Sequence, residues 1–288
     1  MTLTDTEFVF EPFASTTEYR TVNTTIVRDW IDTMVQMGSR RVERLLDIAT
    51  GVGTMVQPFL DNLPKQWKQP VVLCLDKSKE ALEQAKASLG PAVAKLELVH
   101  ASAEEMELPD DSVDVVVWGN GIHYLSVEAQ ERALQAIKKV LKVGGWFFFN
   151  SAFYAEARPP ETLPFYHAQV RRAVKYLRDW GVSRERGEGR PEASNFLPRG
   201  QYERLLQSVG FKVEGVKEVA AHLRRTAWEN ISGFQQYAAG ALHGYRPDAA
   251  AEAMKQAVGP ALEAHGFRDR RGDLGIPRNW LAVSARAL

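Results

Sequence analysis

The sequence predicts an α/β fold in which helices cover both faces of a parallel sheet. Between residues 42 and 152, short apolar runs alternate with segments of helical periodicity. The apolar runs cover residues 44–49, 71–76, 96–100, 114–119 and 146–151. Near-continuous apolar strands separated by helices are typical of a doubly wound, mostly parallel sheet that is buried on both faces.

The segments between the runs have helix boundaries of their own. Ser78 is a suitable N-cap for a helix with an apolar stripe, and Gly90-Pro91 ends that helix. A second stripe at helical spacing lies between Val127 and Leu141 and is followed by Gly144-Gly145. Both stripes predict helices that pack on the sheet.

Beyond residue 152 the alternation weakens. The sequence there predicts a helical stretch from 156 to 180, a helix from 199 to 209, a strand from 211 to 219, a long alanine-rich helical region from 228 to 265 and a last apolar run from 280 to 285. The charged segment 183–192 is interpreted as an exposed loop, with a lid as the alternative.

Composition excludes several classes of protein. The 288 residues are 45% hydrophobic, and 36 basic side chains balance 36 acidic ones, so no global basic field attracts nucleic acid or an anionic membrane. The N-terminus lacks a secretory pattern, and no run of about 18 apolar residues occurs. We therefore expect a cytoplasmic protein whose partner is a small molecule, with self-association left open.

A metal site is not expected. The single cysteine, Cys74, lies inside an apolar run and is interpreted as a buried structural thiol. The histidines at 167, 222, 243 and 265 show no spacing typical of metal ligands.

Ligands of an open α/β sheet bind beyond the carboxyl ends of its strands. After the first run come Ala49, Thr50, Gly51 and Gly53, a turn whose glycines let backbone amides approach a nucleotide-like ligand. Asp76 ends the second run, where a carboxylate can accept both hydroxyls of a ribose. The alternative for this aspartate is a charge at the N-terminus of the next helix.

Two further strand ends complete the predicted site. Ser102, Ala103 and Glu104 follow the third run and are placed to meet an adenine edge. Asn120 and Gly121 follow the fourth run and are placed to hold a polar tail near the glycine turn, unless they form an ordinary loop. A dinucleotide fingerprint is not met, because Val56 stands where its third glycine belongs.

Four segments occur in a characteristic order: LLDIATGVG (45–53), CLDKS (74–78), ASAEEMELPDDSVDVVVWGNGIHYL (101–125) and ALQAIKKVLKVGGWFFF (133–149). Together they resemble the class I S-adenosylmethionine-dependent methyltransferases of the small-molecule type, in the ubiquinone/menaquinone-biosynthesis-like group. The resemblance covers residues 45–151, and the late segments 211–219 and 279–288 match the terminal hairpin of that family more loosely.

The resemblance implies a Rossmann-like methyltransferase fold with a seven-stranded sheet, an antiparallel last strand and a helical cap. It implies S-adenosyl-L-methionine as cofactor and S-adenosyl-L-homocysteine as product. It places Asp47 and the glycine turn at the amino acid portion of the cofactor, Asp76 and the following Lys77 at the ribose, and residues 102–104 at the adenine. Many relatives have aspartate where this chain has Ser102, which accepts a hydrogen bond more weakly.

Catalytic and substrate-side residues are less well defined by the sequence. Methyl transfer needs alignment of the acceptor, and a base only when the acceptor must lose a proton. The candidates are His123, Tyr154 and Glu156, which follow the fourth and fifth strands. Packing is the alternative for His123. Tyr19 is a candidate cofactor contact in an N-terminal helix, with core packing as its alternative.

The expected organisation has four parts: a helical lid (1–40), a cofactor-binding core (41–152), a helical cap that also holds the core helix and strand near 199–219 (153–275), and the last strand (276–288). Aromatic residues gather in the cap and favour an apolar or aromatic acceptor. We expect methylation of carbon or oxygen on a small molecule of secondary metabolism. A cofactor-binding regulatory protein and an RNA or protein methyltransferase are the alternatives.

Overall fold

The computed structural model describes residues 11–184 and 196–288, so most of the charged segment 183–192 lies outside the described residues. Within the described residues one eight-stranded sheet has the order β3-β2-β1-β4-β5-β8-β6, and β7 pairs with β8. Its strands are β1 (Arg44–Ile48), β2 (Val71–Asp76), β3 (Leu96–His100), β4 (Val113–Gly119), β5 (Leu141–Ser151), β6 (Phe211–Arg224), β7 (Phe267–Arg268) and β8 (Leu274–Ala287). The first five are parallel and β8 is antiparallel to both of its long neighbours, which confirms the predicted fold class.

Helices cover both faces of this sheet. The α-helices are α1 (Glu11–Ala14), α2 (Thr17–Gln36), α3 (Val56–Asn62), α4 (Lys79–Leu89), α5 (Val127–Val140), α6 (Leu163–Asp179), α7 (Arg199–Ser208), α8 (Arg225–Ser232), α9 (Gln235–Ala241) and α10 (Pro247–His265). Apolar residues of α2, α3 and α4 pack on one face, and those of α5 and α7 pack on the other. Ser78 and Ser126 cap α4 and α5 by accepting from backbone N–H groups, as serine N-caps do.

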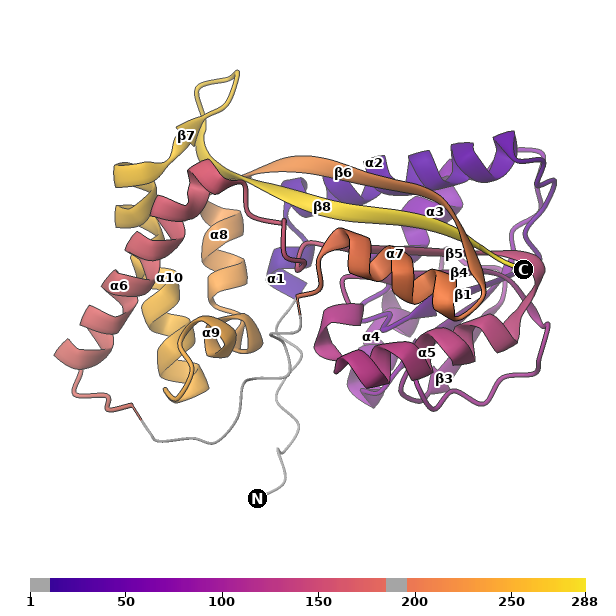
Figure 1. Cartoon of the computed structure of the whole chain (residues 1–288), viewed down its shortest axis with the longest axis horizontal. Helices are drawn as coiled ribbons and strands as arrows, with labels where there is room; N and C mark the ends of the chain where they lie inside the picture. The colour runs from indigo at the N-terminus through magenta and orange to yellow at the C-terminus, as the bar shows by residue number, and fades with distance from the viewer. Residues whose placement is uncertain (1–10, 185–195) are drawn as a thin grey trace.

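The last two long strands extend beyond the sheet. β8 pairs with β5 only over Leu281–Arg286, whereas it pairs with β6 from Gly275 to Ala287. The free part of this β-ribbon reaches a separate helical lobe made of α6, α8, α9 and α10 (Figure 1). Alanine-rich α10 packs closely against α6 within that lobe. The ribbon therefore joins the sheet to the helical lobe.

The long helical region expected from 228 to 265 consists of three helices, α8, α9 and α10. Gly233 follows α8, and Gly244 lies between α9 and α10 with a φ of 86°, a conformation that glycine adopts without strain. Pro247 then starts α10 at a position where proline is favourable. Elsewhere, β6 continues to Arg224, five residues beyond its predicted end at 219, because β8 pairs with it throughout. No described helix is both long and apolar enough to cross a membrane.

Candidate active site

Two tight loops lie side by side at the carboxyl ends of β1 and β4. The backbone is left-handed at Ala49, Gly51 and Gly53 in the first loop, and at Asn120 in the second. A β-carbon on Gly53 would come within 2.6 Å of Leu89, and one on Gly121 within 3.0 Å of the Ala49 β-carbon. A β-carbon at either glycine would therefore displace neighbouring side chains of the loops.

Two buried aspartates hold the first loop. Asp47 Oδ2 accepts from the Thr50 hydroxyl at 2.6 Å, and Asp76 Oδ2 accepts from the Gly51 N–H at 3.0 Å. Asp76 Oδ1 accepts from the Ser78 N–H, so this carboxylate fixes both the glycine turn and the start of α4. Each of its oxygens keeps a second lone pair for a ligand hydroxyl.

The second carboxylate oxygen of Asp47 differs from the first in its hydrogen bonding. This atom, Oδ1, is buried without a hydrogen-bond partner in the described structure. Burial, assisted by the negative charge of Asp76, raises the pKa of Asp47 from 3.8 to about 7. A buried acceptor in this state suits a cationic ligand group.

Helix α2 joins the site through a buried amide network. The Asn120 side chain donates to the Tyr19 hydroxyl at 3.3 Å and accepts from the Ala152 N–H at 2.8 Å. Asn150, at the end of β5, donates to Asn23 of α2 at 2.8 Å and accepts from the Asn120 N–H at 3.2 Å. Sequence reasoning missed Asn23 and Asn150. A polar residue that closes the apolar run FFFN was the available signal for Asn150.

The predicted adenine-side residues follow β2 and β3. Lys77 is exposed directly after Asp76, and Ala103 is buried. The Ser102 hydroxyl donates to Glu105 at 3.2 Å. Glu104 Oε2 is buried without a partner among the described residues, so Glu104 rather than Ser102 offers a free carboxylate oxygen at this strand end.

An aromatic cavity of about 280 Å³ lies between the sheet and the helical lobe. Most of its wall comes from elements far apart in the chain: His123 and Tyr124 after β4, Phe153 after β5, Tyr166 and Gln169 of α6, Phe196, Tyr237 of α9, Met254 of α10 and Arg278 of β8. Ala152, which precedes Phe153 of the cavity wall, donates its N–H to Asn120 of the second loop, and His123 and Tyr124 follow that loop directly. The cavity therefore adjoins the two loops at the strand ends.

His123 is a neutral side chain in this cavity. Its ring lies 4.2 Å from that of Tyr124 and 4.4 Å from that of Phe153, measured between centroids. Burial, assisted by the Arg278 charge, lowers the pKa of His123 to about 3. Its Nδ1 lies 3.4 Å from the Ser151 hydroxyl, with which the neutral ring can form a hydrogen bond.

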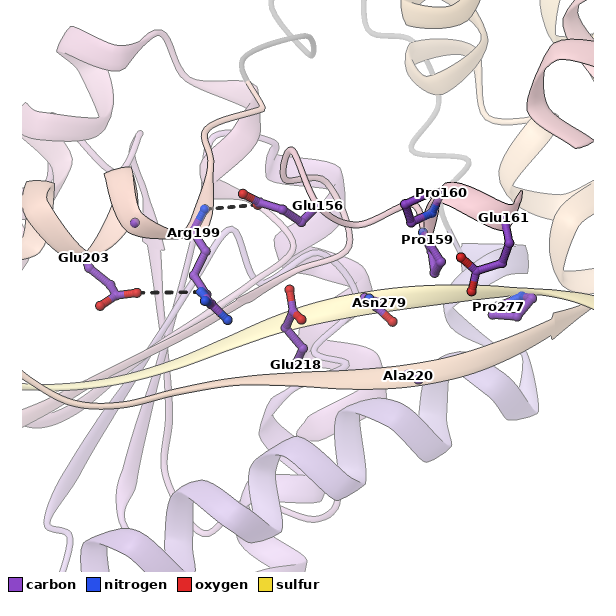
Figure 2. Close-up of a pocket in the computed structure, with 11 residues that line it drawn as sticks. Glu156, Pro159, Pro160, Glu161, Arg199, Glu203, Glu218, Ala220, Pro277 and Asn279 are labelled. Carbon is purple, nitrogen blue, oxygen red and sulfur yellow. Dashed lines mark hydrogen bonds and ion pairs between the residues drawn. The ribbon is translucent and has the colours of Figure 1, made fainter. Parts of the chain in front are cut away.

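The other two candidate catalytic residues lie elsewhere. Tyr154 donates to Glu218 at 2.6 Å, and burial beside Glu218 raises the pKa of Tyr154 well above its usual value. Glu156 accepts from the Arg199 N–H at 3.1 Å, at the N-terminus of α7. Glu156 and Glu218 line a second, acidic hollow of about 690 Å³ (Figure 2). The structure thus does not bring His123, Tyr154 and Glu156 together.

The profile of a family described as a methyltransferase domain matches residues 45–145 of this chain. That range includes both tight loops, Asp47 and Asp76, and the sheet order is that of Rossmann-like methyltransferases. Residues 45–145 therefore have the sequence pattern and the strand order of a methyltransferase domain. Its cofactor class is S-adenosylmethionine, as the sequence resemblance implied.

Curated relatives of the methyltransferase domain match over part of their length. A ubiquinone/menaquinone biosynthesis C-methyltransferase (UbiE) of Francisella tularensis subsp. novicida is 31% identical over 115 residues, which is 39% of this chain and 44% of that protein. A carboxy-S-adenosyl-L-methionine synthase of Trichodesmium erythraeum is 27% identical over 175 residues, 58% of this chain and 65% of that protein. The matched regions thus cover less than two thirds of either relative.

Solved structures share the fold at low identity. A putative methyltransferase from Bacillus halodurans has a TM-score of 0.55 and 15% identity, with 90% of this chain and 98% of that one covered. A [4+2]-cyclase, SpnF, has a TM-score of 0.52 and 16% identity, with 91% and 79% covered. At this identity the likeness establishes the fold, and the reaction has to be argued from the site.

The residues at the strand ends fit the cofactor class. The unpartnered Asp47 Oδ1 suits the ammonium of the methionine portion, and the spare lone pairs of Asp76 suit ribose hydroxyls. Gly51 and Gly53 give this turn its left-handed backbone, which glycine adopts without strain.

Proposed function

We propose that this protein is an S-adenosylmethionine-dependent methyltransferase that transfers a methyl group to a carbon or oxygen of a small aromatic metabolite, in secondary metabolism. One observation carries the proposal: an aromatic cavity adjoins the loops that fit the cofactor, at the carboxyl ends of the strands, where open α/β sheets bind their ligands.

The cofactor half of the site consists of residues after β1, β2, β3 and β4. We assign the methionine portion to Asp47, Thr50, Gly51, Gly53 and the Asn120-Gly121 turn, with Tyr19 closing over it from α2. Asp76 and Lys77 take the ribose side, and Ala103 and Glu104 take the adenine side. When bound, the cofactor supplies a methyl group on a sulfonium, which is a strong electrophile.

The acceptor half is the aromatic cavity. Its side chains exclude water and hold a planar acceptor by stacking and edge contacts. Aromatic faces also favour the cationic character that accompanies methyl transfer. His123 faces the acceptor as a neutral hydrogen-bonding group, so alignment rather than proton removal is its role.

The lining favours a small molecule over a macromolecule. The cavity volume of about 280 Å³ is close to the lower end of small-ligand pockets. Zero net charge provides no general attraction for RNA.

Two measurements test the proposal. Calorimetry with S-adenosylhomocysteine is expected to show one site per chain, and labelled S-adenosylmethionine is expected to transfer its methyl group to a member of a library of small aromatic compounds. Absence of cofactor binding would contradict the proposal. Cofactor binding without turnover of any compound would favour the regulatory alternative, and turnover of RNA or protein alone would favour a macromolecular methyltransferase.

A further inference from the structure

The aromatic cavity contains a buried cation, Arg278, on β8. The residue is 5% exposed, and its guanidinium is one of two arginine groups in the cavity wall, with Arg158. Among the described residues that line the cavity none is acidic, and Arg278 makes no ion pair with any described residue. A buried guanidinium normally has a carboxylate partner, so this one needs an explanation.

Backbone and aromatic groups hold Arg278 in place without neutralising it. Its Nε and Nη2 donate to the Ala152 carbonyl, and its Nη1 donates to the Tyr166 hydroxyl at 3.1 Å. The faces of Phe153 and Trp228 lie 5.0 and 5.9 Å from the guanidinium carbon. Three of the five N–H groups are therefore used, and each terminal nitrogen keeps one donor.

The position of Arg278 relates it to the cofactor half. Ala152, which accepts from Arg278, also donates its N–H to Asn120 of the second tight loop. The backbone of one residue, Ala152, therefore links the guanidinium to the loop that we assign to the methionine portion. A group bound by Arg278 lies within the same cavity as His123 and Tyr124.

A second polar side chain, Gln169, lies in the same wall and has an acceptor atom without a partner in the described structure. Gln169 of α6 is completely buried, and its Nε2 donates to the Ser232 hydroxyl at 2.8 Å and to the Met254 carbonyl at 3.1 Å. Its Oε1 is buried with no partner in the described structure. An empty acceptor in an apolar wall is unfavourable unless a ligand donor meets it.

We infer that the methyl acceptor is an aromatic carboxylate, bound with its carboxylate on the free donors of Arg278 and with a hydroxyl or amino donor on Gln169 Oε1. The inference rests on the proposed function and narrows its substrate class. A carboxylate matches the planar guanidinium and supplies the charge that the cavity lacks. The surrounding rings of Phe153, Tyr166 and Tyr237 accommodate the aromatic part.

The test compares matched acids and amides in the wild-type protein. Calorimetry is run with benzoate against benzamide and with 4-hydroxybenzoate against 4-hydroxybenzamide, each with saturating S-adenosylhomocysteine and again without it. Each acid is expected to bind at least about tenfold more tightly than its amide. 4-Hydroxybenzoate is expected to bind more tightly than benzoate, because its hydroxyl can meet Gln169.

Two arginines of β8 form a matched pair of variants. Arg278→Met is expected to weaken acid binding by about tenfold and to leave amide binding within about twofold, which removes the preference. Arg286→Met is the control, because Arg286 also bonds a backbone carbonyl and lies over a tryptophan but is outside the cavity. Unchanged S-adenosylhomocysteine affinity shows that each variant is folded.

Several results would overturn the inference. Equal binding of acid and amide by the wild-type protein would do so, as would failure of every acid to bind at about 10 mM while S-adenosylhomocysteine binds. Loss of the preference for acids in Arg286→Met as well would show that Arg278 is not its specific cause. Failure of S-adenosylhomocysteine alone would contradict the proposed function instead, and the acid preference measured without it would still test Arg278.

Discussion

The two halves of the site are built differently. The cofactor half consists of backbone groups and short polar side chains in the loops after neighbouring parallel strands, and hydrogen bonds accepted by Asp47, Asp76 and Asn120 fix them. The acceptor half consists of large side chains from several separate elements around the buried Arg278. The first half is encoded in local motifs, whereas the second depends on how the helical lobe packs against the sheet.

The largest effect is expected from Asp47→Asn. Loss of the charge opposite the cofactor ammonium should weaken S-adenosylhomocysteine binding by about 100-fold, since a charge-assisted hydrogen bond contributes about 1.5–3 kcal/mol. Asp114→Asn is the matched control, because Asp114 accepts from the Glu43 and Arg44 N–H groups at the opposite end of the sheet. Calorimetry should show unchanged affinity for the control. Equal losses in both variants would contradict a direct role for Asp47.

The raised pKa of Asp47 predicts a pH dependence of cofactor binding. The free protein holds a proton on Asp47 below a pKa of about 7, and a cationic ammonium binds the ionised form. Affinity for S-adenosylhomocysteine should therefore rise between pH 6 and 8, by up to about tenfold, with release of a proton. Asp47→Asn should lack this slope. A flat profile in the wild-type protein would show that Asp47 does not titrate with binding.

The same pKa predicts the sign of a stability effect. The native state binds a proton on Asp47 more tightly than the unfolded chain, whose aspartate pKa is 3.8. The contribution of this group to unfolding free energy should fall as pH rises from about 4 to about 7, by about 4 kcal/mol at most. Asp47→Asn should remove that fall, and thermal unfolding of the free protein at several pH values measures it.

Alanine variants of two glycines distinguish the cost of a left-handed backbone from the cost of a steric clash. Gly53→Ala places a β-carbon 2.6 Å from Leu89 at a φ of 83°, whereas Gly38→Ala has a φ of 93° and no atom within 4 Å. Both should lose about 1 kcal/mol from the left-handed backbone, and Gly53→Ala about 1 kcal/mol more. Only Gly53→Ala should also weaken S-adenosylhomocysteine binding. Chemical denaturation and calorimetry give both quantities, and equal stability losses would remove packing as the reason for Gly53.

Tyr19→Phe tests the attachment of α2 to the cofactor half. The variant removes the hydroxyl that accepts from Asn120, so about 1 kcal/mol of stability and a few-fold of cofactor affinity should be lost. Tyr176→Phe, in the helical lobe, is the control and should change the stability by less than about 0.5 kcal/mol. An unchanged affinity in Tyr19→Phe would restrict Tyr19 to packing.

The smallest effect is expected from Glu156→Gln. Glu156 lies in the acidic hollow, and glutamine can still accept from the Arg199 N–H. Methyl transfer should stay within about twofold of the wild-type rate constant kcat/KM, whereas His123→Leu should lower it by about tenfold. A larger loss in Glu156→Gln than in His123→Leu would place the acceptor in the acidic hollow and not in the aromatic cavity.

Sequence reasoning brought together the residues at the strand ends because their signals are local, and their role in cofactor binding stays a prediction. Asp47, Gly51 and Asp76 follow apolar runs directly, and parallel strands bring such ends to one edge. It did not find Arg278 or Gln169, because their isolation from carboxylates arises only when β8 and α6 pack together. After β5, consecutive side chains point to different sites: Phe153 lines the aromatic cavity, whereas Tyr154 donates to Glu218 beside the acidic hollow. The sequence did not indicate which of the two residues faces the aromatic cavity.

The most direct test is a crystal structure of the protein with S-adenosylhomocysteine. We expect the ammonium within hydrogen-bonding distance of Asp47, the ribose hydroxyls on Asp76, and the sulfur facing the aromatic cavity of His123 and Arg278. A sulfur that faces the hollow of Glu156 and Glu218 would contradict the assignment of the acceptor half.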